Sequence, residues 1–439
     1  MAQPSADALS QMENTSPRYR ILALASLGGA LEYYDFVVFV FLTPVIGKLF
    51  FASNSPEWVR ETQTFGIFAA GYIVRPIGGI VMAHFGDTRG RKRMFTFSVL
   101  LMAIATFVIA VLPTYTKIGV AAPLLLLAMR LLQGTALGAE APGGWVFGAE
   151  HAKQGHVGAA VGLLTGGLSL GILLGSVVAA TLTFSYSASQ IADGMWRVPF
   201  FLGGVFGLTA MFLRRWLDET PVFEQMRRQA ALCRELPLRR LLRSHRSAVV
   251  TSMLGTCSLI AMIVVVILMT PALLQHSFGL PPHLAQAANL AGAAGLCIGN
   301  IATGAASDRF GIRRVAIAVF GLLTTATYAL YLSAAFRPAL VVPLYLLAGL
   351  GAGASVIAPI LMVAAFPPEI RFTGVSFSYN VATAVMGGIT PLLVSTLSHW
   401  NRFTPAYYVA ITAAIGLAAA LLSPERSLPT VIVSDELVA

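Results

Sequence analysis

The amino-acid sequence predicts an all-α membrane protein with twelve transmembrane helices arranged in two bundles of six. Hydrophobic residues make up 56% of its 439 residues, charged residues only 11%, and the mean hydropathy is +0.76. Soluble domains carry roughly 25% charged residues, so this chain has too little charge to cover a soluble surface of its size. Long stretches without Asp, Glu, Lys or Arg, such as 315–336 and 403–424, match the roughly 20 apolar residues that cross a bilayer.

Twelve spans follow from these charge-free stretches and from others that carry isolated charges. We predict helices because a helix pairs all of its backbone polar groups within one segment, as lipid requires. The predicted helices cover residues 21–45, 63–85, 94–113, 121–148, 158–182, 197–216, 248–272, 284–306, 315–334, 339–364, 374–397 and 405–423.

The distribution of Lys and Arg predicts that both termini are cytoplasmic. Short cytoplasmic loops retain basic residues, and placing the N-terminus inside assigns most of the 29 Lys and Arg to the cytoplasmic side. This topology and the lipid headgroups explain the net charge of +10, so no nucleic-acid partner is needed to account for it.

A charged segment at 214–246 divides the chain into two halves. It carries charges on nearly every turn, which is typical of a solvated linker and not of a membrane span. The sequence therefore predicts a cytoplasmic tail over 1–20, a six-helix bundle over 21–216, a cytoplasmic linker over 217–247, a second six-helix bundle over 248–423 and a cytoplasmic tail over 424–439.

The two halves share a short motif after their second helix. The first half reads FGDTRGRKR at 85–93 and the second reads ASDRFGIRR at 306–314. Asp87 corresponds to Asp308 at the same offset, and each is followed by a glycine and two basic residues. This correspondence predicts that the halves arose by duplication, as in many transporters.

These features resemble the major facilitator superfamily, whose signature loop reads like GDTRGRKR here. Further motifs resemble the metabolite:proton symporter family more narrowly. In two places the chain departs from the family: Tyr33 stands where Trp is commoner, and Ala139 stands in a motif that usually ends Gly-Gly-Glu. The family motifs are GALEYYDF, YIVRPIGG, RLLQGTALGAE, RRWLDETPVF and FPPEIRFTGVSFSYN through GGITP.

The resemblance implies the major facilitator fold and a multi-pass protein of the bacterial inner membrane. It implies alternating-access uptake of a small metabolite with a proton, and no cofactor beyond that coupling proton. The expected substrates are carboxylates such as citrate, dicarboxylates or shikimate, or zwitterions such as proline and betaine. Proton-driven efflux is the alternative within transport, and a transporter-like membrane sensor is the alternative outside it.

Five charged residues inside predicted spans need a functional reason. A charge near the bilayer centre costs about 2.5–3.5 kcal/mol, so such residues are rare. All five lie in the first half, which we therefore expect to hold the coupling machinery. They are Glu32 and Asp35 in the first helix, Arg75 in the second, and Arg130 and Glu140 in the fourth.

Glu32 and Asp35 are three residues apart, so they share a helix face, which we expect to point into the cavity between the halves. A carboxylate in a dry site beside a like charge could bind and release a proton near neutral pH. We favour Asp35 as the proton carrier because it lies deeper. Glu140 is either an exit relay or an anchor for Arg130. The alternative is a permanently ionised network that orders the helices.

Arg75 and Arg130 are candidate ligands for a substrate carboxylate. Arg75 precedes Pro76, which frees a backbone carbonyl, and a guanidinium there attracts carboxylates. Arg75 could instead pair with Glu32 or Asp35. Arg130 resembles a helix 4 arginine that the superfamily often links to proton transfer. Further neutral candidates for substrate contacts are Tyr34, Asn300, Tyr379 and Asn380.

The signature loop is a candidate cytoplasmic gate. By resemblance, Asp87 is expected near the start of the eleventh helix, at 373–375, where the helix dipole favours an anion by about 0.3–1 kcal/mol. Arg91 and Arg371 could add charged contacts, and Asp308 is the counterpart in the second half.

Two motifs that suggest chemistry are rejected. GLSLG at 167–171 matches a nucleophile elbow, but Ser169 lies in a charge-free helix without the strand-turn-helix context, so we interpret it as helix packing. His151 and His156 have no apparent third ligand for a metal. We therefore predict neither an enzyme nor a metal site. The fifth helix also lacks the Gly-Pro pair typical of antiporters, which favours symport.

Overall fold

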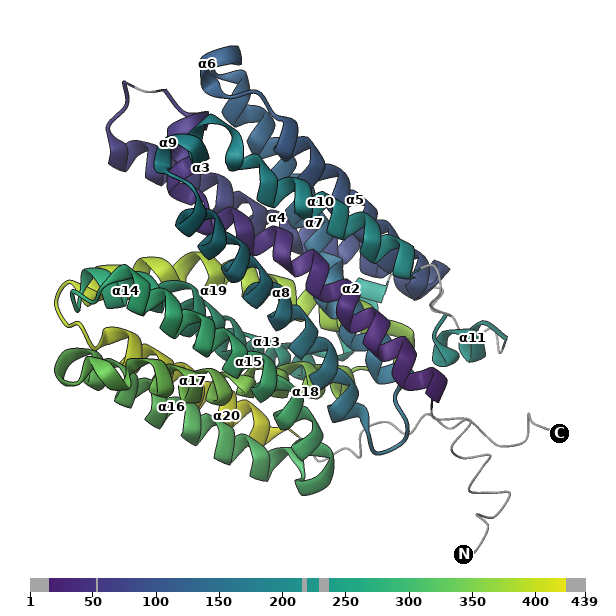
Figure 1. The fold of residues 1–439 in the computed structure, drawn as a ribbon. Helices are drawn as coiled ribbons and strands as arrows, with labels where there is room; N and C mark the ends of the chain where they lie inside the picture. Colours follow the sequence, from purple (N-terminus) through teal and green to yellow (C-terminus); the bar gives the residue numbers. More distant parts are fainter. Residues whose placement is uncertain (1–15, 53, 215–218, 229–236, 424–439) are drawn as a thin grey trace, which may run out of the picture.

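The computed structural model describes residues 16–52, 54–214, 219–228 and 237–423, and the regular structure in these ranges is helical. Twelve helices in this part of the chain are long and apolar enough to cross a membrane. The predicted fold class and helix number are therefore confirmed. Figure 1 shows the halves as two bundles, the first in purple to teal and the second in green to yellow.

The first half contains six long helices and several short ones at the end opposite the linker. The long helices are α2 (Ser16–Phe41), α4 (Glu57–Arg89), α5 (Arg91–Val111), α7 (Ala121–His151), α8 (Val157–Ser185) and α10 (Arg197–Arg214). The short ones are α3 (Thr43–Phe50), α6 (Tyr115–Ile118), α9 (Ala188–Gln190) and η1 (Ile191–Met195).

The second half follows two short linker helices, α11 (Pro221–Arg228) and α12 (Pro237–Ser244). The seventh span of the chain is made of α13 (Arg246–Met262), η2 (Ile263–Met269) and α14 (Thr270–His276). The tenth span is made of η3 (Pro338–Leu340), α17 (Val341–Ala352), η4 (Gly353–Val356) and α18 (Ile357–Ala365). The others are α15 (Pro282–Phe310), α16 (Ile312–Phe336), η5 (Pro368–Ile370) with α19 (Arg371–Ser398), and α20 (Thr404–Leu422).

The seventh span runs further than predicted because a π-helical segment carries it past a proline. Pro271 has no N–H to donate to the preceding turn. The backbone carbonyl of Val266, which an N–H at residue 271 would bond in a π-helix, instead accepts a hydrogen bond from the hydroxyl of Tyr345. The helix therefore continues to His276 and not to residue 272.

The signature motif forms a one-residue connection in each half where a loop was expected. Gly90 joins α4 to α5 with φ of 117°, and Gly311 joins α15 to α16 with φ of 82°. Only glycine adopts such angles without steric cost, which explains why both copies of the motif keep it. We refer to the end of the molecule that holds these glycines as the predicted cytoplasmic end.

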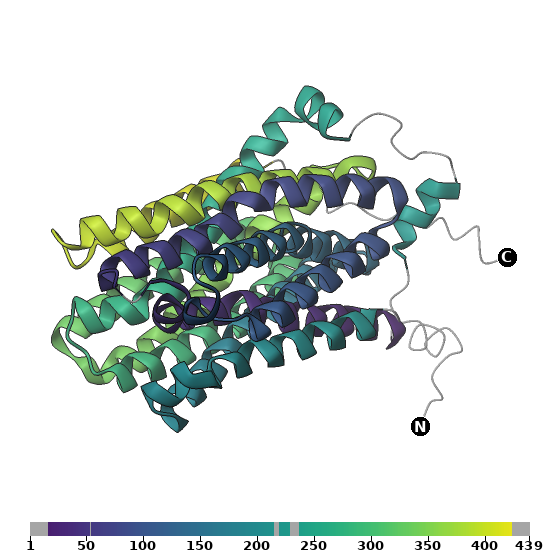
Figure 2. The same cartoon turned by 90° about the horizontal axis from the view of Figure 1, so that it is seen from above.

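The two halves meet mainly along α8 with α15 and α4 with α19, and α7 also contacts α19. Figure 1 shows α8 lying against α15, and Figure 2 shows the long helices of both bundles running in similar directions. Gly162 on α8 and Gly304 on α15 are so close that a Cβ on either would contact the other backbone. Small residues therefore bring the halves into close contact, as the glycine-rich fifth helix suggests.

Candidate functional site

Asp35 lies inside the first half, between α2, α5 and α10. Its Oδ2 accepts a hydrogen bond of 2.9 Å from the hydroxyl of Thr106, and the residue is 1% exposed. A Cβ on Gly203 would overlap Oδ1, so the carboxylate rests directly on the backbone of α10. No donor among the described side chains reaches Oδ1. The prediction that Asp35 points into the cavity between the halves is wrong, because Thr106 and Gly203 provide a polar pocket within its own half.

Arg130 is linked to Asp35 through two neutral side chains. Its Nη1 donates to Gln133 Oε1 at 2.8 Å, and Gln133 Nε2 donates to Thr106 Oγ1 at 2.8 Å. All of these side chains are buried, and the guanidinium carbon lies 4.0 Å from the ring centroid of Phe39. The sequence predicted the two charged ends of this chain. It gave no signal for Thr106 or Gln133, because neutral residues in a helix carry no obvious cost.

Arg75 lies on α4 where the two halves meet. It is 1% exposed, and its guanidinium carbon is 4.1 Å from the ring centroid of Tyr72. It interacts electrostatically with Tyr379 on α19 of the other half. Tyr379 packs edge-on against Trp145 of α7, with ring centroids 5.0 Å apart. One arginine and three aromatic side chains therefore gather at the interface. Trp145 was not predicted, although a tryptophan in a glycine-rich span is a usable signal.

Glu140 lies apart from Arg130. Its Oε2 accepts a hydrogen bond of 3.3 Å from Ser98 on α5, and it is 3% exposed. The two residues are ten positions apart on α7, which corresponds to about 15 Å along a helix. Glu140 is therefore not an anchor for Arg130, and its role as an exit relay stays a prediction. The side chain of Glu32 lies outside the part of the chain that the structure describes.

Three neutral candidates are buried in contacts between helices. Tyr34 donates to the carbonyl of Pro199 at 3.0 Å and so faces α10, which leaves it directed away from the other half. Asn300 donates to Ser169 at 2.9 Å, and Asn380 donates to the carbonyl of Gly138 at 2.7 Å. Both asparagines therefore connect the halves in this conformation. The bond to Asn300 also fits the interpretation of Ser169 as a packing residue.

Asp87 and Asp308 form equivalent contacts at the predicted cytoplasmic end. Asp87 Oδ2 accepts hydrogen bonds from the backbone N–H of Thr373 at 2.9 Å and from its hydroxyl at 2.8 Å. Asp308 accepts from the backbone N–H of Gly158 at 2.8 Å and of Ala159 at 2.7 Å. The predicted position of Asp87 at the start of the eleventh helix is confirmed.

A buried ion pair joins the halves at the same end. Arg371 Nη1 lies 2.9 Å from Glu150 Oε1, and the side chains are 4% and 0% exposed. Arg371 was predicted as a gating residue. Its partner Glu150 was missed, because the predicted fourth helix stopped at residue 148 whereas α7 continues to His151. The side chain of Arg91 lies outside the described part of the chain.

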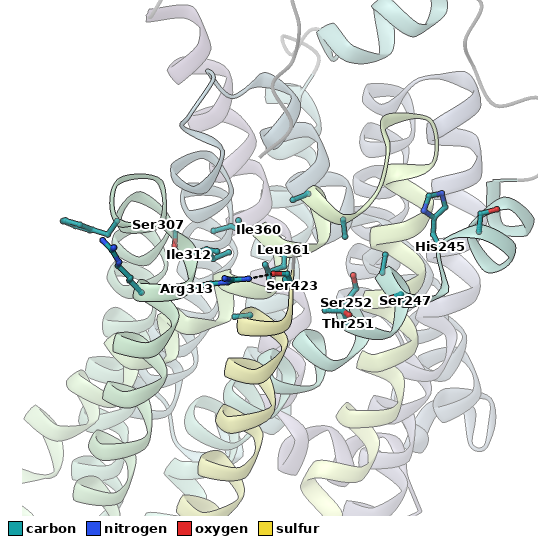
Figure 3. A pocket seen from close by; sticks show the side chains of 18 residues that line it. His245, Ser247, Thr251, Ser252, Ser307, Ile312, Arg313, Ile360, Leu361 and Ser423 are labelled. Carbon is teal, nitrogen blue, oxygen red and sulfur yellow. Dashed lines mark hydrogen bonds between the residues drawn. The ribbon is translucent and has the colours of Figure 1, made fainter. Parts of the chain in front are cut away.

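A cavity of about 1010 Å³ lies within the second half at the predicted cytoplasmic end. Basic and hydroxyl side chains line it, including His245, Ser252 and Arg313. Arg313 Nη2 donates to the carbonyl of Ser423 at 3.1 Å, as Figure 3 shows. Because its lining residues come from the second half and the end of the linker, and none from the first half, we do not place it on the path between the halves.

Comparison with known proteins identifies the family. The model of the Major Facilitator Superfamily matches residues 25–391 and 251–433. A citrate-proton symporter of Klebsiella pneumoniae is 32% identical over 418 residues, which cover 91% of this chain and 90% of that protein. A proline/betaine transporter of Escherichia coli strain K12 is 27% identical over 428 residues, covering 93% of this chain and 84% of that protein.

Solved structures agree on the fold. The proton:xylose symporter XylE bound to 6-bromo-6-deoxy-D-glucose matches with a TM-score of 0.76 at 18% identity, covering 93% of this chain and 95% of that chain. The human organic anion transporter MFSD10 matches with a TM-score of 0.70 at 15% identity, covering 94% of this chain and all of that chain (100%). The protein is thus a multi-pass transporter of the bacterial inner membrane and not an enzyme, and it belongs to the Major Facilitator Superfamily, within its metabolite:proton symporter family.

Proposed function

We propose that the protein imports a small metabolite with at least one carboxylate, together with a proton. The observation that carries this proposal is the chain of hydrogen bonds between Asp35 and Arg130. It joins a buried acid, which can take up a proton, to a buried guanidinium, which can bind an anion. Asp35 and Arg130 are joined through other side chains and do not contact each other directly. Asp35 can therefore bind the proton and Arg130 the substrate, and each event can influence the other.

The substrate class follows from the two arginines. A guanidinium binds a carboxylate through two parallel hydrogen bonds, and burial strengthens that interaction. Arg75 lies at the interface of the halves and Arg130 lies deeper in the first half, and the two interact electrostatically. The citrate, proline and betaine in the names of the relatives all carry a carboxylate. Tyr72, Trp145 and Tyr379 supply apolar and polar surface beside Arg75.

Coupling between proton and substrate follows from competition for Arg130. An ionised Asp35 attracts the guanidinium, whereas a protonated Asp35 does not. Protonation therefore makes Arg130 available to a substrate carboxylate, and the two ligands bind cooperatively. The proton is the only coupling species that this scheme requires.

Alternating access uses the contacts at the predicted cytoplasmic end. In the described conformation Asp87, Asp308 and the Glu150–Arg371 pair hold the halves together there. Rocking of one half against the other must break these contacts before substrate can leave to that side.

Transport by purified protein in lipid vesicles tests this function. Radiolabelled citrate, proline and glycine betaine are offered separately with an imposed proton gradient, acidic on the side of entry. We expect one of them to accumulate with the gradient and to stop accumulating when a protonophore removes it. If proton and substrate move in opposite directions, the proposed uptake is wrong and the protein is a proton-driven exporter.

A further inference from the structure

We propose that Thr106 and Gln133 form a relay that positions a hydrogen bond on Asp35 according to the state of Arg130. We name these two residues the relay. The proposal rests on the proposed function in one respect, that Asp35 carries the coupling proton. Neither residue carries a charge, and both are fully buried between α5 and α7.

The direction of every hydrogen bond in the relay is fixed by chemistry. A guanidinium only donates, so the Gln133 oxygen must face Arg130 and the Gln133 amide N–H must face Thr106. Thr106 Oγ1 accepts that bond and has one hydrogen left to donate. Donors therefore point from the cation toward Asp35.

The hydroxyl hydrogen of Thr106 has two possible acceptors. Asp35 Oδ2 lies 2.9 Å from Thr106 Oγ1, and the backbone carbonyl of Met102 lies 3.0 Å from it. One hydrogen cannot serve both well. The hydroxyl hydrogen can therefore point either to Asp35 or to Met102. The amide of Gln133 donates to the same oxygen, so its position can favour one of the two orientations.

Movement of Arg130 changes that bias. When a substrate carboxylate draws Arg130 away, Gln133 loses the donor that holds its amide in place, and the hydroxyl of Thr106 can turn to Met102. Asp35 then loses its only hydrogen-bond donor among the described side chains, in a site where Oδ1 already has none. An ionised carboxylate in that position is disfavoured, so it takes up a proton. Substrate binding thereby promotes proton binding.

Few other titratable groups face Asp35. Arg130 on α7 is the charged group that acts on it, and the neighbouring Tyr34 interacts with it electrostatically. The helix α8 contains no titratable residue, and neither does α5 beyond Arg93 or α10 between its terminal arginines. On α2 itself Glu32 lies one turn away, and its side chain is outside the described part of the structure. The relay is therefore the main polar contact of Asp35 with its described surroundings.

Infrared titration of the full chain in lipid vesicles tests the relay without a substrate. The carboxylic acid band of protonated Asp35 is assigned by its loss in Asp35→Asn. Thr106→Val keeps the shape of the side chain but removes the donor. In this variant we expect the titration midpoint of Asp35 to move to more alkaline pH by about 1–2 units, because the ionised carboxylate loses a hydrogen bond. Thr106→Ser restores the hydroxyl and should titrate like the wild type.

A second variant acts one step further from Asp35. Gln133→Leu leaves the hydroxyl of Thr106 in place but removes its orienting donor, so we expect a smaller shift in the same direction. An Asp35 band that titrates in the wild type with an identical midpoint in Thr106→Val and Gln133→Leu overturns the relay alone. A wild-type Asp35 that does not titrate at all overturns both the proposed proton site and the relay.

Discussion

Asp87 and Asp308 are equivalent in the two halves of the protein, and each caps the start of a helix in the opposite half. Asp87, near the end of α4, binds the first turn of α19, and Asp308, near the end of α15, binds the first turn of α8. A carboxylate is favoured at a helix N-terminus because backbone N–H groups and the helix dipole both attract it. The duplicated motif thus produces two symmetric contacts between the halves.

Replacing either aspartate should open the predicted cytoplasmic end. Asp87→Asn and Asp308→Asn each weaken charge-assisted bonds worth about 1.5–3 kcal/mol, so the open population should rise about 10-fold or more. Labelling of Ser376→Cys, which is fully buried on α19, by an impermeant maleimide in inside-out vesicles measures this change. The native cysteines are first replaced. Asp193→Asn at the opposite end is the control, and labelling no faster than in that control would refute the gate.

The Glu150–Arg371 pair should contribute more to stability than an exposed pair. Glu150→Gln removes the carboxylate in contact with this buried guanidinium and leaves it only the more distant charges of Asp87 and Glu369, which we expect to lower the free energy of unfolding by up to about 3–5 kcal/mol. The matched control is Glu224→Gln, because Glu224 and Arg227 form an exposed pair at 2.7 Å. Exposed pairs contribute roughly 0–1 kcal/mol. Reversible unfolding in detergent micelles gives both values, and equal losses would contradict a specific role for the buried pair.

Asp35→Asn should separate transport from proton coupling. The amide keeps the shape of the side chain but cannot release a proton, so accumulation driven by a gradient is lost while exchange of labelled for unlabelled substrate persists. Asp193→Asn is the control, since Asp193 is an exposed acid in η1 that lies outside the proposed coupling site, and it should accumulate substrate normally. Normal accumulation in both Asp35→Asn and Glu32→Gln would show that the helix 1 carboxylates do not couple protons.

Arg75→Lys should weaken substrate binding because a lysine cannot form two parallel bonds to a carboxylate. We expect the KM to rise about 10–100-fold, in line with the loss of one charge-assisted contact. Arg89 on the same helix also lies over an aromatic ring, 4.7 Å from the centroid of Phe85, but it is exposed. Arg89→Lys is therefore the matched control. A KM that changes equally in both variants would remove Arg75 from the substrate site.

External pH should affect substrate affinity in one direction. Because proton and substrate bind cooperatively in the proposed scheme, acidification on the side of entry should lower the KM, and saturating substrate should favour protonation by the same factor. Counterflow measured at a series of pH values, each equal on both sides of the membrane, gives the KM without a net proton gradient. An exporter that exchanges substrate for a proton should show the opposite trend.

The sequence contained enough information for the fold and for part of the site. Low charge and charge-free stretches of membrane length determine twelve spans, because lipid offers no partner to an exposed backbone group. Buried charges are costly and therefore rare, so Asp35, Arg75, Arg130 and Glu140 could be selected from their positions alone. The duplicated motif located both aspartates that bond to helix starts in the opposite half.

Tertiary structure alone decided which neighbours each side chain contacts. We predicted that Asp35 faces the cavity between the halves. It lies instead against α5 and α10, because Gly203 has no side chain to exclude the carboxylate and the hydroxyl of Thr106 donates to it. Neutral residues such as Gln133 cost little wherever they lie, so helical position does not identify them. Only the packing of three helices brings Gln133 and Thr106 between Arg130 and Asp35. A hydrogen bond forms or fails over differences in distance of a few tenths of an ångström, and the spacing of residues along the sequence does not specify distances that closely.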